Sequence, residues 1–258
     1  MIDGLDRIMV LTLDTTDTDR LMNYYTKFFD KDKIEFYRVA RTNPRPTNEG
    51  TLDTRFMDIV LHRSLDDTSM SITRNHIEMI RSAYTNHYEY VLFLEDDARF
   101  TSLSKYDKIP KMIEQNLSRK KEWDIFYLGY CPWPCLLSYF VHQNIVRVFT
   151  PLTCHAYILH RHSMEKILIY FDQTKSANQT HIDKLFCKIP GLRKHAIFPS
   201  IAFQEKDPAL YTKAMDFCRV SIPFAYLSRI FEYLSVMLPI IIMSLIILFI
   251  IRLFFIHK

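Results

Sequence analysis

The stretch Tyr90-Val91-Leu92-Phe93-Leu94-Glu95-Asp96-Asp97 joins an apolar run directly to a cluster of carboxylates. The apolar residues predict a strand that is buried on both faces, as strands of parallel sheets are. Adjacent carboxylates repel one another and resist the loss of water, so beside a core they need a cation or a ring of donors. Ligands of open α/β sheets bind at the carboxyl ends of strands. The stretch therefore predicts a divalent metal site that handles a phosphorylated substrate, although a strand entering an ordinary acidic turn would look the same.

Alternating strand and helix patterns surround this stretch. Apolar runs predict strands at 7–13, 34–39, 123–129 (broken by Gly129), 145–149, 155–160 and, as the last strand, 196–199. Helical spacing of apolar residues covers 20–29, 69–84, 109–117, 163–171 and 181–186. Residues 41–53, rich in Pro, Asn and Thr, predict a loop. The order predicts an α/β fold with a mixed, mostly parallel sheet covered by helices.

Composition excludes several classes of function. The net charge of +4 over 258 residues includes no basic tract of the kind found in nucleic-acid binders, so we expect no nucleic-acid partner. The only glycines are Gly4, Gly50, Gly129 and Gly191, which leaves no G-x-G-x-x-G motif and no Walker A loop. The cysteines are odd in number and irregularly spaced, which favours reduced thiols over a disulfide framework.

The carboxyl-terminal part of the sequence has a different character. Residues 234–251 are uncharged, and as a helix they would span about 27 Å at about 1.5 Å per residue, close to a bilayer core. We predict a membrane anchor at 233–256, an amphipathic connector at 208–232 and a single domain at 1–207. The amino terminus lacks the pattern of a signal peptide. We therefore expect a single-pass anchor inserted after synthesis, with the catalytic domain in the cytosol.

Several short motifs occur in an informative order. They are Val10-Leu-Thr-Leu-Asp14 with Asp19-Arg20, Asn75-His76, Leu94-Glu95-Asp96-Asp97, Trp123-Asp124 with Leu128-Gly129, Ala156-Tyr157-Ile158-Leu159 with the helix from Ser163, Asp183, and Pro199 to Gln204. This order resembles glycosyltransferase family 25, the group of bacterial lipopolysaccharide galactosyltransferases and the collagen galactosyltransferase domain. The resemblance covers about residues 7–205. Asn75 departs from it, because the family usually has Ser before His.

The resemblance implies a single GT-A-like domain that binds a nucleotide sugar. It also implies a UDP-sugar donor, most often UDP-galactose, Mn²⁺ or another divalent cation, and inversion at the anomeric carbon. A hard cation held by carboxylate oxygens would neutralise the departing diphosphate. In this interpretation Asp97 is the direct metal ligand. Glu95 binds the metal through water or contacts the donor ribose, and Asp96 supports either role.

Other residues are candidates for the rest of the site. Inversion needs a base for the acceptor hydroxyl, and Asp183 is the first choice and Asp124 the second. Donor contacts are predicted for Leu13 at the end of the first strand, for His76, and for Arg20 and Arg74, whose forked guanidinium groups suit a diphosphate. His155, His181 and His195 are candidates for a further metal or phosphate contact, with no preference among them.

Two alternatives stay open at this point. A metal-dependent phosphoesterase or nuclease would also cluster carboxylates at strand ends, although such enzymes usually spread the ligands of two metals over several motifs. A non-catalytic, membrane-tethered binding domain with a degenerate transferase fold is the second alternative. The acceptor can be a glycan, a protein or a lipid-linked sugar.

Overall fold

A computed structural model describes residues 4–39, 67–100, 114, 117, 122–132, 139–142, 145–149, 151–177, 180–198 and 200–205. The strands are β1 (Arg7–Leu13), β2 (Ile34–Val39), β3 (Tyr90–Glu95), β4 (Ala98–Phe100), β5 (Ile125–Pro132), β6 (Tyr139–His142), β7 (Ile145–Arg147), β8 (Pro151–His160), β9 (Lys194–Ile197) and β10 (Ala202–Gln204). The helices are α1 (Thr18–Tyr25), α3 (Asp67–Thr85), α5 (Arg161–Gln173) and α6 (Ile182–Lys188), with a 3₁₀ turn at Lys31–Lys33. The predicted loop at 41–53, most of the predicted helix at 109–117, the connector and the anchor lie outside these residues.

Most of the strands form one sheet, in the order β2-β1-β3-β8-β5-β9-β7-β6. β8 runs antiparallel to both β3 and β5, and β7 runs antiparallel to β9 and β6. The other strands point the same way, which confirms a mixed, mostly parallel sheet. The carboxyl ends of β1, β3, β5 and β9 therefore meet at one edge, where an open α/β sheet binds its ligands.

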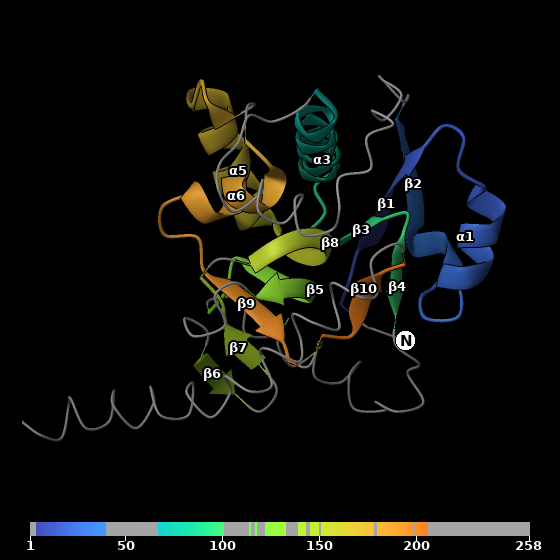
Figure 1. Cartoon of the computed structure of the whole chain (residues 1–258). Coiled ribbons are helices and arrows are strands. Elements are labelled where there is room, and N and C mark those ends of the chain that lie inside the picture. Colours follow the sequence, from blue (N-terminus) through green and yellow to red (C-terminus); the bar gives the residue numbers. More distant parts are fainter. Residues whose placement is uncertain are drawn as a thin grey trace, which may run out of the picture.

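Both faces of the sheet are covered. Figure 1 shows α3, α5 and α6 on one side and the small β4–β10 pair on the other. On the first side, Met9, Phe93 and Tyr127 pack under the apolar residues of the three helices. On the second side, Leu92, Leu94 and Phe126 pack with residues of α1, β4 and β10. Because both faces are buried, β1 and β3 are apolar almost throughout.

The predicted bounds hold for the strands β1 and β2, while other elements differ. The helix predicted at 20–29 begins earlier, because the Asp17 carboxylate caps it by accepting from the Arg20 N–H. It ends at Tyr25, and a tighter turn follows in which Phe28 N–H donates to the Tyr25 carbonyl.

Two predictions about strands were wrong. The strand predicted at 123–129 and broken by Gly129 continues as β5 to Pro132, and its register is irregular on either side of the glycine. The strand predicted at 196–199 is not the last, because β10 follows and pairs with β4. Each of these two strands is only three residues long, too short to produce a clear alternating pattern.

Candidate functional site

The acidic turn, Glu95-Asp96-Asp97, lies between the end of β3 and the start of β4. β3 is parallel to β1, and Glu95 stands beside Leu11 in the register of the pair. The turn is thus at the carboxyl edge of the sheet, and its residues are partly exposed. The predicted position of the carboxylates, at the end of a strand buried on both faces, is confirmed.

Both carboxylate oxygens of Glu95 accept hydrogen bonds from side chains on distant elements, and neither donor is a lysine or an arginine. His76 Nε2 on α3 lies 3.2 Å from Oε1, and Gln204 Nε2 on β10 donates to Oε2 at 2.9 Å. Burial by itself would raise the pKa of Glu95, but His76, His155 and Gln204 outweigh burial, so the pKa lies below its ordinary value. Glu95 is therefore ionised, and its orientation is set from both sides of the sheet.

The orientation of His76 is set in turn by Tyr157 on β8. The Tyr157 hydroxyl lies 2.9 Å from His76 Nδ1, and both side chains are fully buried. Burial, and then the charges of Cys154 and Glu95, raise the pKa of Tyr157 well above its ordinary value. The phenol therefore keeps its proton. Because the Glu95 carboxylate only accepts, Nε2 of His76 carries the hydrogen that it donates. The chain Tyr157–His76–Glu95 fixes the orientation of the imidazole.

The side chain of Asp96 is held by the loop between β1 and α1. The Thr16 hydroxyl donates to Asp96 Oδ2 at 2.8 Å. Thr16 belongs to a polar stretch that follows the strand predicted at 7–13, and sequence reasoning assigned it no role. The only signal for it was its position after a strand that is parallel to β3.

The main chain of the turn is also fixed. The Tyr25 hydroxyl lies 3.2 Å from the carbonyl of Glu95 and 3.1 Å from that of Ala98, and so bridges the turn. Further donors reach the turn from Arg99, whose guanidinium bonds the carbonyls of Asp96 and Ala98, and from the Glu205 N–H, which bonds the Asp97 carbonyl at 2.8 Å. A turn fixed in this way presents its carboxylates in one arrangement before any ligand binds.

The candidate base Asp183 lies in the first turn of α6 and is buried. Asp183 and Glu95 both act on the buried thiol of Cys154. Burial, and then the negative charges of Asp183 and Glu95, raise the pKa of this thiol well above its ordinary value. The start of α6 is tied to α3, because the Thr73 hydroxyl donates to the Thr180 carbonyl at 2.9 Å. Asp183 is therefore on the same side of the sheet as His76.

The second candidate base, Asp124, is not brought together with the acidic turn. It immediately precedes β5, so it lies at the amino edge of the sheet, opposite to Glu95. Its oxygens are 3.0 Å from Lys166 Nζ and 3.0 Å from Arg193 Nε. Burial would raise the pKa of Asp124, but the hydrogen bonds from Arg193 and Lys166 outweigh it and lower the pKa.

The other predicted residues are distributed around the carboxyl edge and beyond it. Leu13 ends β1 at that edge. Arg20 and Arg74 are exposed on α1 and α3, and in the described part of the chain no hydrogen bond or ion pair joins either to the acidic turn. His181 precedes α6, and His195 pairs with Phe126 near the amino end of β5. Of the three histidines left open, His155 is the one that contacts β10, because its Nε2 lies 3.2 Å from the carbonyl oxygen of Ala202.

The described residues contain no group of three or more His, Cys, Asp or Glu side chains that could hold a metal by themselves. Within the same residues, no helix is both long enough and apolar enough to cross a membrane. The roles of Asp97 and Glu95 toward a metal, and the anchor at 233–256, remain predictions.

Comparisons with known proteins give similarity of fold only. No protein-family model matches the sequence, so membership of family 25 stays a prediction. No curated protein matches it either. Among solved structures, the chain is similar to a glycosyltransferase involved in the glycosylation of the major capsid of PBCV-1, with 11% identity and a TM-score of 0.43, over 83% of this chain and 99% of that one. It is also similar to A197 from STIV, with 12% identity and a TM-score of 0.42, over 77% of this chain and 85% of that one. A third similar structure is apo-UDP-glucose pyrophosphorylase, with 10% identity and a TM-score of 0.39, over 81% of this chain and 80% of that one.

Proposed function

We propose that this chain is a metal-dependent glycosyltransferase that moves a sugar from a UDP-sugar to an acceptor hydroxyl with inversion. The observation that carries the proposal is the acidic turn at the carboxyl edge of the sheet. The side chains of Glu95 and Asp96 are held by hydrogen bonds from Thr16, His76 and Gln204. None of these donors is a lysine or an arginine, so they fix the shape of the two carboxylates without bringing a permanent cation to them, which leaves room for a hard cation.

The residues present suit a divalent cation such as Mn²⁺. Asp97 would hold the ion directly, and Glu95, whose two oxygens already accept hydrogen bonds, would act on it through water or meet the donor ribose. Because too few side chains converge for a closed site among the described residues, water and the donor diphosphate would complete the coordination. When bound, the ion supplies charge stabilisation for the departing diphosphate.

Asp183 is the base in this proposal. The acceptor hydroxyl loses its proton as its oxygen attacks the anomeric carbon, and the bond to the diphosphate breaks on the opposite face. Asp183 is a buried carboxylate on the side of the sheet that carries His76. Asp124 is a weaker candidate, because its charge is already balanced by Lys166 and Arg193 at the other edge.

The sequence resemblance favours galactose as the sugar transferred. An anchor at 233–256 would hold the domain beside a membrane, on its cytosolic side. A lipid-linked sugar or a membrane protein would then be the acceptor within reach.

A thermal-shift screen of nucleotide sugars, with and without Mn²⁺, tests the proposal. A ligand that binds only the folded state stabilises it by about 2.7 kcal/mol at a concentration one hundred times its Kd. We expect a UDP-sugar to raise the melting temperature when Mn²⁺ is present. Turnover of phosphodiesters in place of UDP-sugars would support the phosphoesterase alternative, and the absence of any nucleotide binding would support the non-catalytic one.

A further inference from the structure

One side of the acidic turn is built by β10 and the residue after it. β10 pairs antiparallel with β4, which places Gln204 opposite Ala98. From there Gln204 Nε2 donates to Glu95 Oε2 at 2.9 Å, and the next residue, Glu205, donates its N–H to the Asp97 carbonyl at 2.8 Å. Whatever fixes β10 therefore also fixes a donor on the Glu95 carboxylate.

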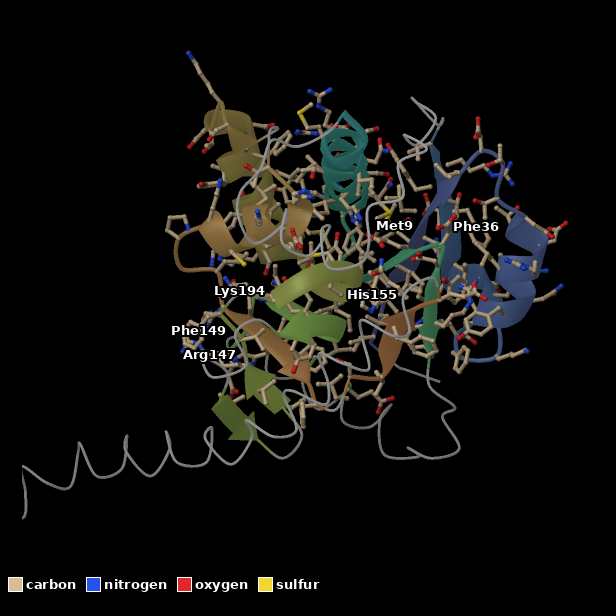
Figure 2. All side chains as sticks on the ribbon, viewed as in Figure 1. Met9, Phe36, Arg147, Phe149, His155 and Lys194 are labelled. Carbon is tan, nitrogen blue, oxygen red and sulfur yellow. The ribbon has the colours of Figure 1, made fainter. Side chains whose placement is uncertain are left out.

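His155 on β8 reaches β10 from the main sheet. Its side chain is 1% exposed, and its Nε2 lies 3.2 Å from the carbonyl oxygen of Ala202, the first residue of β10. A carbonyl only accepts hydrogen bonds, so Nε2 carries the hydrogen. Figure 2 shows His155 in the interior of the molecule, close to β10.

The other ring nitrogen of His155 makes no hydrogen bond with the described residues, although it is buried. Burial lowers the pKa of His155 despite the opposing charge of Glu95 and the bond to Ala202, so the ring is neutral and Nδ1 is an acceptor. Leaving a buried acceptor unsatisfied costs about 1–3 kcal/mol. A leucine would avoid this cost, so what the imidazole adds at this position is its bond to Ala202.

The space for this ring depends on a glycine of β5. A Cβ at position 129 would lie 2.1 Å from His155 Nε2 and 2.5 Å from the Ala202 carbonyl oxygen, so no other residue fits without a shift. Gly129 thus lets β8 and β10 approach each other across β5. This explains why the strand contains a glycine that does not end it.

We propose that His155 is a positioning residue, which holds β10 through Ala202 at the place where Gln204 reaches Glu95. His155 acts on the acidic turn through Gln204. The inference deepens the proposed function, because Glu95 matters to catalysis only if the turn binds a metal and a donor. The link from His155 to Gln204 is a property of the unliganded protein and can be measured without either ligand.

The first measurement is the NMR signal of the Gln204 side-chain amide in the full-length protein. In His155→Leu we expect the amide shift to change and its hydrogen exchange to accelerate. His155→Gln, whose amide can donate near the position of Nε2, should restore both. Arg81→Gln is the matched control, since it breaks the exposed ion pair with Asp172 and should leave the Gln204 signal unchanged. If His155→Leu does not fold, His155→Asn, whose amide is too short to reach Ala202, takes its place.

The second measurement is a double-mutant cycle on the Kd of UDP in the presence of Mn²⁺. Loss of a hydrogen bond that orients a metal-site carboxylate typically costs about tenfold or more in affinity. We expect about that loss for His155→Leu and for Gln204→Met, and no further loss in the double variant. An unchanged Gln204 amide in a folded His155→Leu protein, or losses of affinity that add, would overturn the inference. A wild-type protein that binds no Mn²⁺–UDP would refute the proposed function instead, and the NMR result would still decide the role of His155.

Discussion

Two carboxylates with lowered pKa values stand at opposite edges of the same sheet, and they differ in whether their partners are permanent cations. Glu95, at the carboxyl edge, accepts from the imidazole of His76 and the amide of Gln204. Asp124, at the amino edge, is 1% exposed and pairs with two cations, Lys166 and Arg193. Asp124 is paired with a lysine and an arginine, and Glu95 is not.

We propose that this difference separates a binding site from a structural one. An aspartate balanced by two cations ties the helix α5 and the segment before β9 to the start of β5, and little field remains to attract a ligand. At the carboxyl edge, the side chains of Glu95 and Asp96 accept hydrogen bonds from a hydroxyl, an imidazole and an amide, none of which belongs to a lysine or an arginine. Even Arg99, which reaches the acidic turn, directs its hydrogen bonds to main-chain carbonyls and to Glu205. The carboxyl edge is therefore the edge at which we propose that a cation binds.

The largest effect is expected for Asp97→Ala at the carboxyl edge. Removal of the proposed direct ligand should reduce Mn²⁺-dependent turnover of the UDP-sugar by about a thousandfold or more, equivalent to about 4 kcal/mol of transition-state stabilisation. Circular dichroism and the melting temperature should stay close to wild type. Turnover at the wild-type rate would remove Asp97 from the metal site.

Asp183→Asn should separate catalysis from binding at the same edge. The amide keeps the size of the side chain but cannot take a proton, so kcat should fall by about a hundredfold or more while the Kd of the donor is retained. The measurement is steady-state kinetics together with calorimetric titration of the donor. Equal losses of kcat and donor affinity would indicate that Asp183 has a structural role.

At the amino edge the expected change is in stability. Asp124→Asn removes the charge that balances Lys166 and Arg193, which are about one-third exposed, and should lower the free energy of unfolding by about 2–3 kcal/mol. The Kd of UDP with Mn²⁺ should not change. Urea titration and calorimetry measure the two quantities. Weaker donor binding at unchanged stability would place Asp124 in the active site and break the contrast between the edges.

The contrast also has a pH dependence. The pKa of Asp124 is lowered in the native state, so its contribution to stability is present above the unfolded value of about 3.9 and is lost as the pH falls through the native pKa. The difference in unfolding free energy between wild type and Asp124→Asn should therefore shrink below about pH 4. Glu95 contributes with the same sign to both proteins and cancels in the difference. A difference that stays constant on acidification would show that the charge of Asp124 is not what stabilises the fold.

The sequence allowed the buried strands and the position of the carboxylates at a strand end to be predicted. It did not allow the hydrogen-bond partners that come from distant parts of the chain to be predicted. The apolar runs at 7–13 and 34–39 predict β1 and β2 with their observed bounds, because burial on both faces leaves a continuous pattern. The same pattern places Glu95 at a strand end. Its partners, however, are 19 and 109 residues away in the chain, and only the tertiary fold brings them together.

The position of Asp124 shows the same limit. Standing after a tryptophan and before an apolar strand, it suited a catalytic carboxylate as well as a structural one. What distinguishes the two is a lysine 42 residues further along the chain and an arginine 69 residues further along. β10 was missed for a related reason. Its three residues are too few to show the alternation of a strand, and the strand forms through its pairing with β4 and its contact with His155.

The smallest expected effect is that of Lys166→Met, which removes one of the two cations from Asp124. The aspartate keeps the bonds to its second oxygen from the main-chain N–H of Arg193, at 2.8 Å, and from Arg193 Nε, at 3.0 Å. Because Lys166 is partly exposed and screened by solvent, its loss should cost about 1 kcal/mol in the free energy of unfolding. In the Asp124→Asn background the same substitution should cost almost nothing, because the charge that Lys166 balances is already gone. If the loss of stability persists in that background, the aliphatic stem of Lys166 stabilises the protein by packing. Ion pairing with Asp124 would then contribute less to the stability of the amino edge than we propose.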